Sequence, residues 1–165
     1  MVFTRAFLLV IVAFSVDALK WSNCDGSSPV QIKDISLSPH PVILRKGAKV
    51  TFSGKFKVES AVGINYKLDV TLKREGWWGI WIPIPCFGKC THDIGCNQLI
   101  TLLEGERCPL RSPKEYIVRK QEHVLPDVNI PSFLTSGTYK VQADLRDKAS
   151  NKRISCVEAV VTITE

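Results

Sequence analysis

The stretch AKVTFSGKFKV, residues 48–58, decides the fold of this chain. Apolar side chains recur at alternate positions, and polar or lysine side chains occupy the positions between them. A period of two places successive side chains on opposite faces of an extended chain, one dry and one wet. Residues 64–72 and 139–145 repeat the pattern. The sequence therefore predicts several β-strands with one buried face each.

Further strands are predicted at residues 154–163 and at residues 30–37, where the alternation slips at Lys33 and Asp34 as in a β-bulge. Weaker patterns predict strands at residues 41–45 and 116–124, and only residues 94–103 have the apolar face of a short helix. This order of elements indicates an all-β fold of two antiparallel sheets that face one another. The strand period leaves open whether the sheets enclose a packed core or a hollow.

The first residues have the features of an export signal. Arg5 precedes an apolar run, and Val16 and Ala18 supply the small side chains expected before a cleavage site. The run is much shorter than the roughly 20 residues that a spanning helix needs. We predict a signal peptide at residues 1–18 and one exported domain at residues 19–165. The net charge of +6 is spread along the chain, and export argues against nucleic acid as a partner.

The six cysteines form an even set, so three disulfides are expected in an exported chain. Their spacing alone does not choose among the possible pairings. A zinc site at Cys86, Cys90 and Cys96 is disfavoured because no matching histidine pattern accompanies them. The sequence predicts no metal and no cofactor.

Residues 77–85, WWGIWIPIP, contain three of the four tryptophans. Pro83 and Pro85 lack the amide hydrogen that a central strand donates, so this segment belongs at a sheet edge or in a loop. Large aromatic side chains at an exposed position favour contact with an apolar partner. The partner that we predict is lipid.

Several motifs resemble a known family. LPDVNIPSFLTSGTYK at residues 125–140 is similar to a signature of the ganglioside activator (GM-two activator) family, part of the ML lipid-recognition superfamily. WSNCD at residues 21–25 resembles the start of the mature family members, and GIWIPIPC at residues 79–86 resembles their apolar loop before a cysteine pair. GERCP at residues 105–109 follows the same order. Ordered motifs over nearly the whole domain are more specific than one short motif.

The resemblance implies an immunoglobulin-like antiparallel sandwich, opened into a cup whose interior accepts acyl chains, with one short helix. It also implies three disulfides, which join Cys24 to Cys156, Cys86 to Cys90, and Cys96 to Cys108. The family commonly has a fourth bridge just before the position of Cys108. This chain is shorter there and lacks both cysteines, so that loop and any enzyme contact it makes in relatives are not carried over.

The function implied by the resemblance is non-enzymatic lipid binding and transfer. Such a protein extracts a glycosphingolipid or phospholipid from a membrane surface and presents it to a soluble glycosidase such as β-hexosaminidase. The inward residues of the predicted strands are the candidates to line the cavity, and they would equally fill a closed core. These residues are Val50, Phe52, Phe56, Tyr66, Leu68, Val70, Val141 and Leu145.

Two loops map onto the membrane-facing rim of the family. Their candidate residues are Trp77, Trp78, Ile80, Trp81, Phe133 and Leu134. Indole rings favour the boundary between water and hydrocarbon, so we expect Trp77 and Trp78 to contact lipid. We expect Trp81 to fold inward and fill part of the core. Lys73, Arg74 and Lys89 lie near this rim, where they are either solvated or in contact with anionic headgroups.

An enzyme is disfavoured because the chain has no G-x-S-x-G, H-E-x-x-H or phosphate-loop motif. The alternatives are a secreted sterol or phospholipid carrier, an immune lipid-recognition protein of the same superfamily, and an adhesion sandwich with a filled core. The chain has no N-x-[ST] glycosylation motif, which leaves glycan-dependent sorting to the lysosome unsupported. We therefore predict a secreted protein, with the lysosome as the alternative location.

Overall fold

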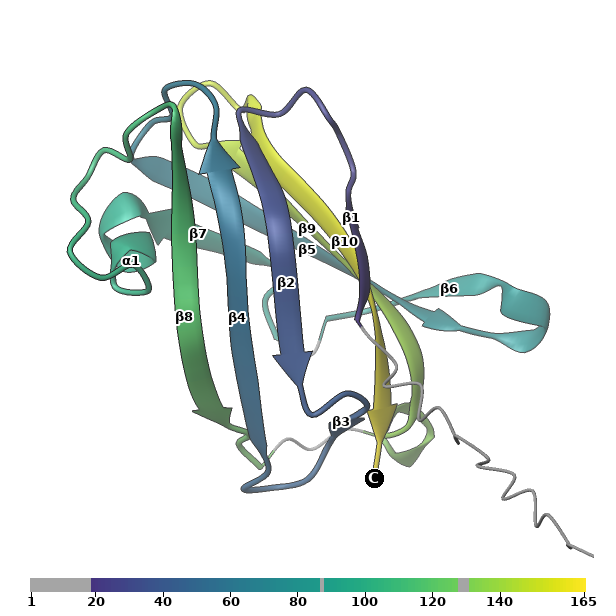
Figure 1. The fold of residues 1–165 in the computed structure, drawn as a ribbon. Helices are drawn as coiled ribbons and strands as arrows, with labels where there is room; N and C mark the ends of the chain where they lie inside the picture. Colours follow the sequence, from purple (N-terminus) through teal and green to yellow (C-terminus); the bar gives the residue numbers. More distant parts are fainter. Residues whose placement is uncertain (1–18, 87, 128–130) are drawn as a thin grey trace, which may run out of the picture.

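The computed structural model describes residues 19–86, 88–127 and 131–165 (Figure 1). The predicted signal peptide and residues 128–130 of the family signature lie outside the described residues. The strands are β1 (Lys20–Asn23), β2 (Val30–Ser38), β3 (Val42–Ile43), β4 (Lys49–Val58), β5 (Asn65–Glu75), β6 (Trp81–Ile84), β7 (Thr91–Gly95), β8 (Lys114–Val124), β9 (Gly137–Asp147) and β10 (Arg153–Thr164). One helix, α1 (Cys96–Ile100), and two 3₁₀ turns, Trp77–Gly79 and Ser132–Leu134, complete the described elements.

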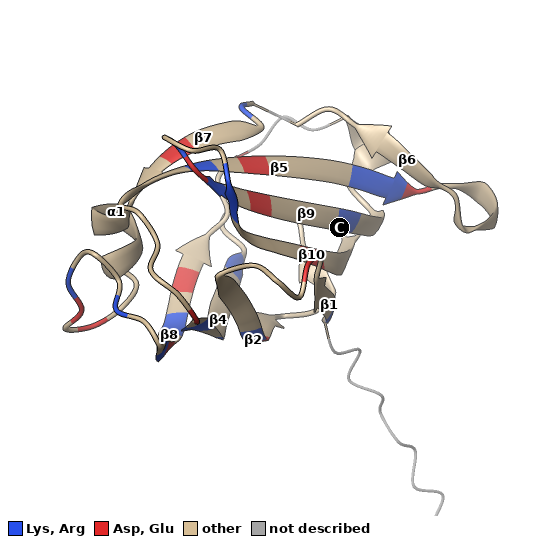
Figure 2. Ribbon diagram, turned by 90° about the horizontal axis from the view of Figure 1, so that it is seen from above, with Lys and Arg blue, Asp and Glu red and all other residues tan. Residues whose placement is uncertain are grey.

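The strands form two sheets that face each other as separate layers (Figure 2). The larger sheet has the order β1-β10-β9-β5-β6, with β3 beside β10 and β7 beside β5. The smaller sheet has the order β2-β4-β8. Every pairing in the described part of the chain is antiparallel except that of β3 with β10. This architecture confirms the predicted all-β sandwich with one short helix.

The predicted strands at residues 30–37, 48–58, 64–72, 139–145 and 154–163 correspond to β2, β4, β5, β9 and β10. The weaker pattern at residues 116–124 lies in β8. The bulge predicted in β2 is present, since its register against β4 shifts between Ile32 and Asp34. Opposite this bulge, Gly54 has no room for a side chain, because a Cβ there would lie 2.8 Å from the carbonyl oxygen of Asp34.

Two predicted elements are shorter than expected. The strand at residues 41–45 is reduced to Val42–Ile43, and the helix at residues 94–103 to Cys96–Ile100. Ile94 is not helical because it pairs with Tyr66 in the ladder between β7 and β5. The short strands β1 and β7 had no predicted counterpart, whereas β6 is an edge strand within the segment that was predicted to lie at a sheet edge or in a loop. Pairing with a longer neighbour holds each of the three in place.

A packed core lies at the α1 end of the sandwich. Its centre includes Val58, Tyr66 and Tyr116, which are almost fully buried. The ring of Phe56 stacks on that of Tyr116, with the two ring centroids 5.2 Å apart. The disulfide between Cys96 and Cys108 closes this end. The remaining buried members of the cluster are Val30, Cys96, Leu103, Leu110, Val118 and Ile154.

Away from α1 the space between the sheets is not filled. Leu68, Val70 and Leu72 of β5 share the inward face of Tyr66, yet all three are only partly buried. The same holds for Val141, which pairs with Leu72 on the neighbouring strand β9. In a packed sandwich such inward positions are buried. The inner faces of the two sheets are therefore only partly covered toward the β6 end, and this partly open region is the hollow of the sandwich.

The three disulfides join the cysteines in the pairs that the family resemblance implies. Cys24 and Cys156 are 132 positions apart and tie the first strand to the last. In the chain-entropy model a closed loop of this size contributes about 5 kcal/mol. This stabilisation supports a domain whose interior is partly hollow. No helix in the described part of the chain is long and apolar enough to cross a bilayer.

Candidate functional site

An apolar cavity of about 230 Å³ lies between the two sheets, next to the packed core. Strands of both sheets contribute to its wall, as do the loop after β4 and helix α1. The lining residues are Val30, Ile32, Phe56, Val62, Tyr66, Leu68, Ile94, Leu99, Leu110, Ala143, Leu145, Ile154, Ser155 and Val157. A wall of this composition suits hydrocarbon rather than a charged ligand.

Tyr66 is the largest polar side chain in this wall, and its hydroxyl already forms a hydrogen bond within the protein. The hydroxyl donates a hydrogen bond of 2.5 Å to the carbonyl oxygen of Gly63. Burial raises the pKa of Tyr66, and the nearby charge of Asp147 raises it further. The phenol therefore stays neutral and satisfied, and the cavity gains no free charge from it.

Phe56, Tyr66, Leu68 and Leu145, four of the eight predicted cavity residues, line this cavity. The other four, Val50, Phe52, Val70 and Val141, lie outside its wall. Val70 and Val141 follow the cavity residues on the same inward faces of β5 and β9, toward the β6 end. Val50 and Phe52 occupy the corresponding part of β4, and all four are partly buried.

Some cavity residues carried a signal that the sequence interpretation did not use. Ala143 and Val157 fit the alternation of β9 and β10, and Ile94 and Leu99 belong to the apolar face of the predicted helix. Val62 lies in a loop and had no such pattern. Its place in the wall depends on how the connection from β4 to β5 folds over the end of the sandwich.

A hairpin formed by the end of β5, the turn Trp77–Gly79 and β6 projects from the sandwich (Figure 1). Trp77 is 86% exposed and Trp78 is 94% exposed, and Ile80 is also exposed. The backbone of Trp78 is left-handed, with φ of 58°, a conformation that is rare for a bulky residue. The turn thus holds two neighbouring indoles in solvent. Strain of this kind at an exposed aromatic residue points to a functional surface.

Trp81 does not fill the core as expected. It pairs with Glu75 in the β5–β6 ladder, one position beyond the inward-facing Arg74, so it lies on the outer face of the sheet. The ammonium group of Lys140 lies 4.7 Å from the centroid of its ring, and Lys140 also pairs with Glu158 at 3.1 Å. The register between β5 and β6 determines which face of the sheet Trp81 occupies, and the sequence did not reveal that register.

The second predicted rim loop places its two residues differently. Phe133 is 68% exposed, whereas Leu134 is only 7% exposed. The carbonyl oxygen of Leu134 accepts a 2.6 Å hydrogen bond from the hydroxyl of Tyr139, which fixes this turn against β9. The prediction that Leu134 faces the membrane is therefore wrong.

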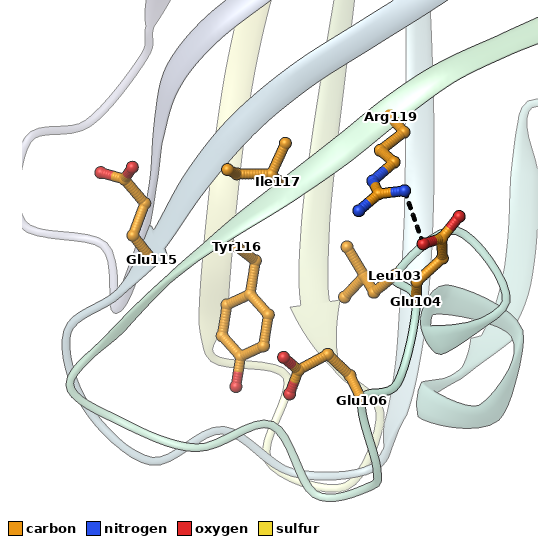
Figure 3. Close-up of a pocket in the computed structure, with 7 residues that line it drawn as sticks. All are labelled: Leu103, Glu104, Glu106, Glu115, Tyr116, Ile117 and Arg119. Atoms are coloured by element: carbon orange, nitrogen blue, oxygen red, sulfur yellow. Dashed lines mark ion pairs between the residues drawn. The ribbon is translucent and has the colours of Figure 1, made fainter.

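A second hollow of about 230 Å³ lies at the β8 edge of the smaller sheet (Figure 3). Charged side chains dominate it, and Glu104 pairs with Arg119 at 2.7 Å within it. Glu106 pairs with Lys114 at 2.6 Å. These internal pairs and the charged wall make the outer hollow unsuitable for hydrocarbon. Across the described ranges, no three His, Cys, Asp or Glu side chains come together as a metal site.

The hollow sandwich and its apolar cavity define a class of protein, and comparison with known proteins agrees. Residues 18–163 match the ML domain model, and the chain belongs to the ML domain family. The match confirms the family that the sequence motifs indicated.

Among individual relatives, the chain is 31% identical to the "Ganglioside GM2 activator" of Macaca fascicularis, over 88% of this chain and 83% of that protein. It is 27% identical to the "Phosphatidylglycerol/phosphatidylinositol transfer protein" of Aspergillus oryzae, over 86% of this chain and 69% of that protein. Its fold is similar to that of a Niemann-Pick type C2 protein from the Japanese carpenter ant, with a TM-score of 0.50 and 15% identity. That alignment covers 88% of this chain and 99% of the other.

Proposed function

We propose that this protein is a non-enzymatic lipid carrier that removes a glycosphingolipid or phospholipid from a membrane and shields its acyl chains between the two sheets. The observation that carries the proposal is the partly exposed apolar interior, which continues from the cavity toward the β6 end. Exposing apolar surface costs about 25 cal/mol per Å², so an interior that is left open by its own side chains favours an apolar occupant.

The size of the cavity fits part of a lipid. Small-molecule sites usually span about 300–1,000 Å³, and the cavity here has about 230 Å³. It therefore accepts the end of one acyl chain, while the partly open region beside Val70 and Val141 accepts the rest. Each methylene that moves into water costs about 0.8 kcal/mol, so a continuous apolar path is needed for a chain to leave the bilayer.

The hairpin with Trp77 and Trp78 supplies the membrane contact in this proposal. Both indoles are exposed, and indole favours the boundary between headgroups and hydrocarbon. Phe133 adds a third exposed aromatic side chain, on another loop. Contact at this rim would bring the open end of the hollow to the bilayer surface before transfer.

Lipid transfer between vesicles tests the carrier function. Purified protein is incubated with vesicles of mixed glycosphingolipid and phospholipid and re-isolated, and the bound lipid is identified by mass spectrometry. We expect about one lipid per protein, together with protein-dependent transfer of a fluorescent lipid to acceptor vesicles. Recovery of lipid-free protein and an unchanged transfer rate would refute the proposal.

Presentation to a glycosidase is the more specific form of the proposal, supported by the ganglioside activator relatives. We expect the protein to increase hydrolysis of vesicle-bound glycolipid by β-hexosaminidase and to hydrolyse none when the hexosaminidase is left out. The fungal phospholipid transfer relative supports the alternative, a phospholipid carrier without a hydrolase partner. Lipid transfer without stimulation of the hexosaminidase would favour that alternative. Secretion, with the lysosome as the alternative, remains our proposed location.

A further inference from the structure

Arg74 is a cation on the apolar inner face of the larger sheet. Its partners in the ladders are Tyr139 of β9 and Ile82 of β6. The register of β5 is unbroken from Tyr66 to Arg74, so the guanidinium shares the face of Leu68 and the cavity. A charge on such a face is costly unless a counter-charge accompanies it.

No carboxylate in the described part of the chain forms an ion pair with Arg74. Its Nη2 donates to the carbonyl oxygen of Ser136 at 3.1 Å, and its Nε is buried without a partner. Glu75, the next residue, points to the opposite face by strand alternation. The guanidinium is thus held in place by neutral groups, and its charge is not balanced.

Gly137 leaves room for this arrangement. A Cβ at that position would lie 3.1 Å from Nε and 3.3 Å from Nη2 of Arg74, and the φ of Gly137 is +137°. A glycine here allows the guanidinium to lie close against the β9 backbone, at the level where the hairpin leaves the sheet. The position therefore holds the guanidinium against the β9 backbone at the rim, with its Nε buried and its Nη2 at the exposed side.

The distance from the cavity to Arg74 is comparable to the depth of one leaflet of a bilayer. Arg74 lies six positions after Leu68 on β5, which corresponds to about 20 Å along a strand. One leaflet of the hydrocarbon core of a bilayer is about 15 Å deep. An acyl chain with its end beside Leu68 would therefore place its headgroup near Arg74, after passing Val70 and Leu72 on the same face.

We propose that Arg74 binds the anionic group of the carried lipid, a phosphate or a carboxylate, at the mouth of the hollow. The inference rests on the proposed carrier function and assigns a headgroup class to it. A guanidinium binds both groups through paired N–H donors, and such charge-assisted hydrogen bonds are the strong ones. Arg74 is then a residue that determines specificity for anionic over neutral lipids with the same chains.

Competition within one vesicle tests this inference. One vesicle set contains equal amounts of phosphatidic acid and diacylglycerol, which differ by the phosphate. A second contains a sialylated glycosphingolipid and its asialo counterpart, which differ by the carboxylate. The ratio of anionic to neutral lipid bound to the re-isolated protein is measured by mass spectrometry. The two sets distinguish phosphate from carboxylate as the recognised group.

We expect the wild-type protein to enrich the anionic member of at least one set by about tenfold, and Arg74→Gln to abolish the enrichment. Arg74→Lys should retain only part of it, because an ammonium lacks the paired donors. Lys73→Gln is the matched control, since it removes the same charge from the neighbouring position on the outer face of β5. It should keep the wild-type ratio, and thermal unfolding checks that all variants are folded.

Equal ratios in the wild-type protein and Arg74→Gln would overturn the inference, as would an equal loss in Lys73→Gln. Uptake of both lipids without preference by the wild-type protein would overturn it while leaving the carrier function intact. Failure to take up any lipid would overturn both.

Discussion

The side-chain amide of Asn23 joins the two sheets by bonding both backbone groups of Ile32. Its Nδ2 donates to the carbonyl oxygen of Ile32 at 2.9 Å, and its Oδ1 accepts from the amide nitrogen of Ile32 at 2.9 Å. Asn23 ends β1 in the larger sheet, and Ile32 precedes the bulge of β2 in the smaller one. The pair thus holds the sheets together at a point where the ladder of β2 is interrupted.

Asn23→Ala should therefore lower the free energy of unfolding by about 1–3 kcal/mol, because it leaves two backbone groups of Ile32 without partners. Asn23→Asp keeps the acceptor but loses the donor at neutral pH, so it should also destabilise. Urea unfolding measures both effects. Asn97→Asp on the exposed side of α1 is the control and should change stability little. Equal stability of Asn23→Ala and the wild-type protein would contradict the bridging role.

Removing the two exposed indoles should weaken membrane binding without unfolding the domain. Trp77→Ala with Trp78→Ala is expected to reduce binding to vesicles by at least about tenfold. Burial of only about 60 Å² of apolar surface contributes a binding free energy that corresponds to a tenfold change in affinity. Vesicle flotation measures binding, and the melting temperature should be nearly unchanged because both side chains are solvated. Ile117→Ala is the control, since Ile117 is exposed on β8. Undiminished binding by the double variant would refute docking through this hairpin.

Filling the cavity should reduce lipid uptake. Ala143 lines the cavity of about 230 Å³, so Ala143→Phe would place a ring in the space that we propose for an acyl chain. We expect the lipid bound per protein to fall several-fold, while the domain stays folded because the cavity has room for the ring. Gln142→Phe adds the same ring at the next position of β9, on the outer face, and should keep wild-type uptake. Normal uptake by Ala143→Phe would show that lipid lies elsewhere.

Asp144 should stabilise the domain even under acidic conditions. Its hydrogen bond with Arg153 and the charge of Arg146 hold its pKa below the ordinary value. A depressed pKa gives a contribution that is fully present above the unfolded-state pKa of about 3.9 and is lost as the pH falls through the folded-state pKa.

Asp144→Asn is therefore expected to lower the free energy of unfolding by about 1–2 kcal/mol at both pH 7 and pH 5. The difference from the wild-type protein should shrink below about pH 4. Asp93→Asn is the control, because the pair of Asp93 with Lys148 is largely exposed and should contribute little. Urea titrations at several pH values measure the effect, and a difference that grows on acidification would contradict this assignment.

The sequence was sufficient for most of the fold and for part of the site. The alternation at residues 48–58 and its repeats predicted the long strands because burial of one face is a local property of a strand. The same alternation identified Phe56, Tyr66, Leu68 and Leu145 as inward residues of the cavity wall. It did not identify Val62, because a loop residue has no period that reveals its direction.

By itself, the sequence determined the all-β class, the family and, through the family, the cysteine pairs. Only the tertiary structure decided that the interior is hollow toward β6, that Trp81 lies outside under Lys140, and that Leu134 is buried. It also decided that the uncompensated charge of Arg74 faces the apolar hollow. Strand period fixes which side chains share a face. Strand pairing, sheet separation and turn geometry determine what each face meets, and these depend on contacts between residues far apart in the chain.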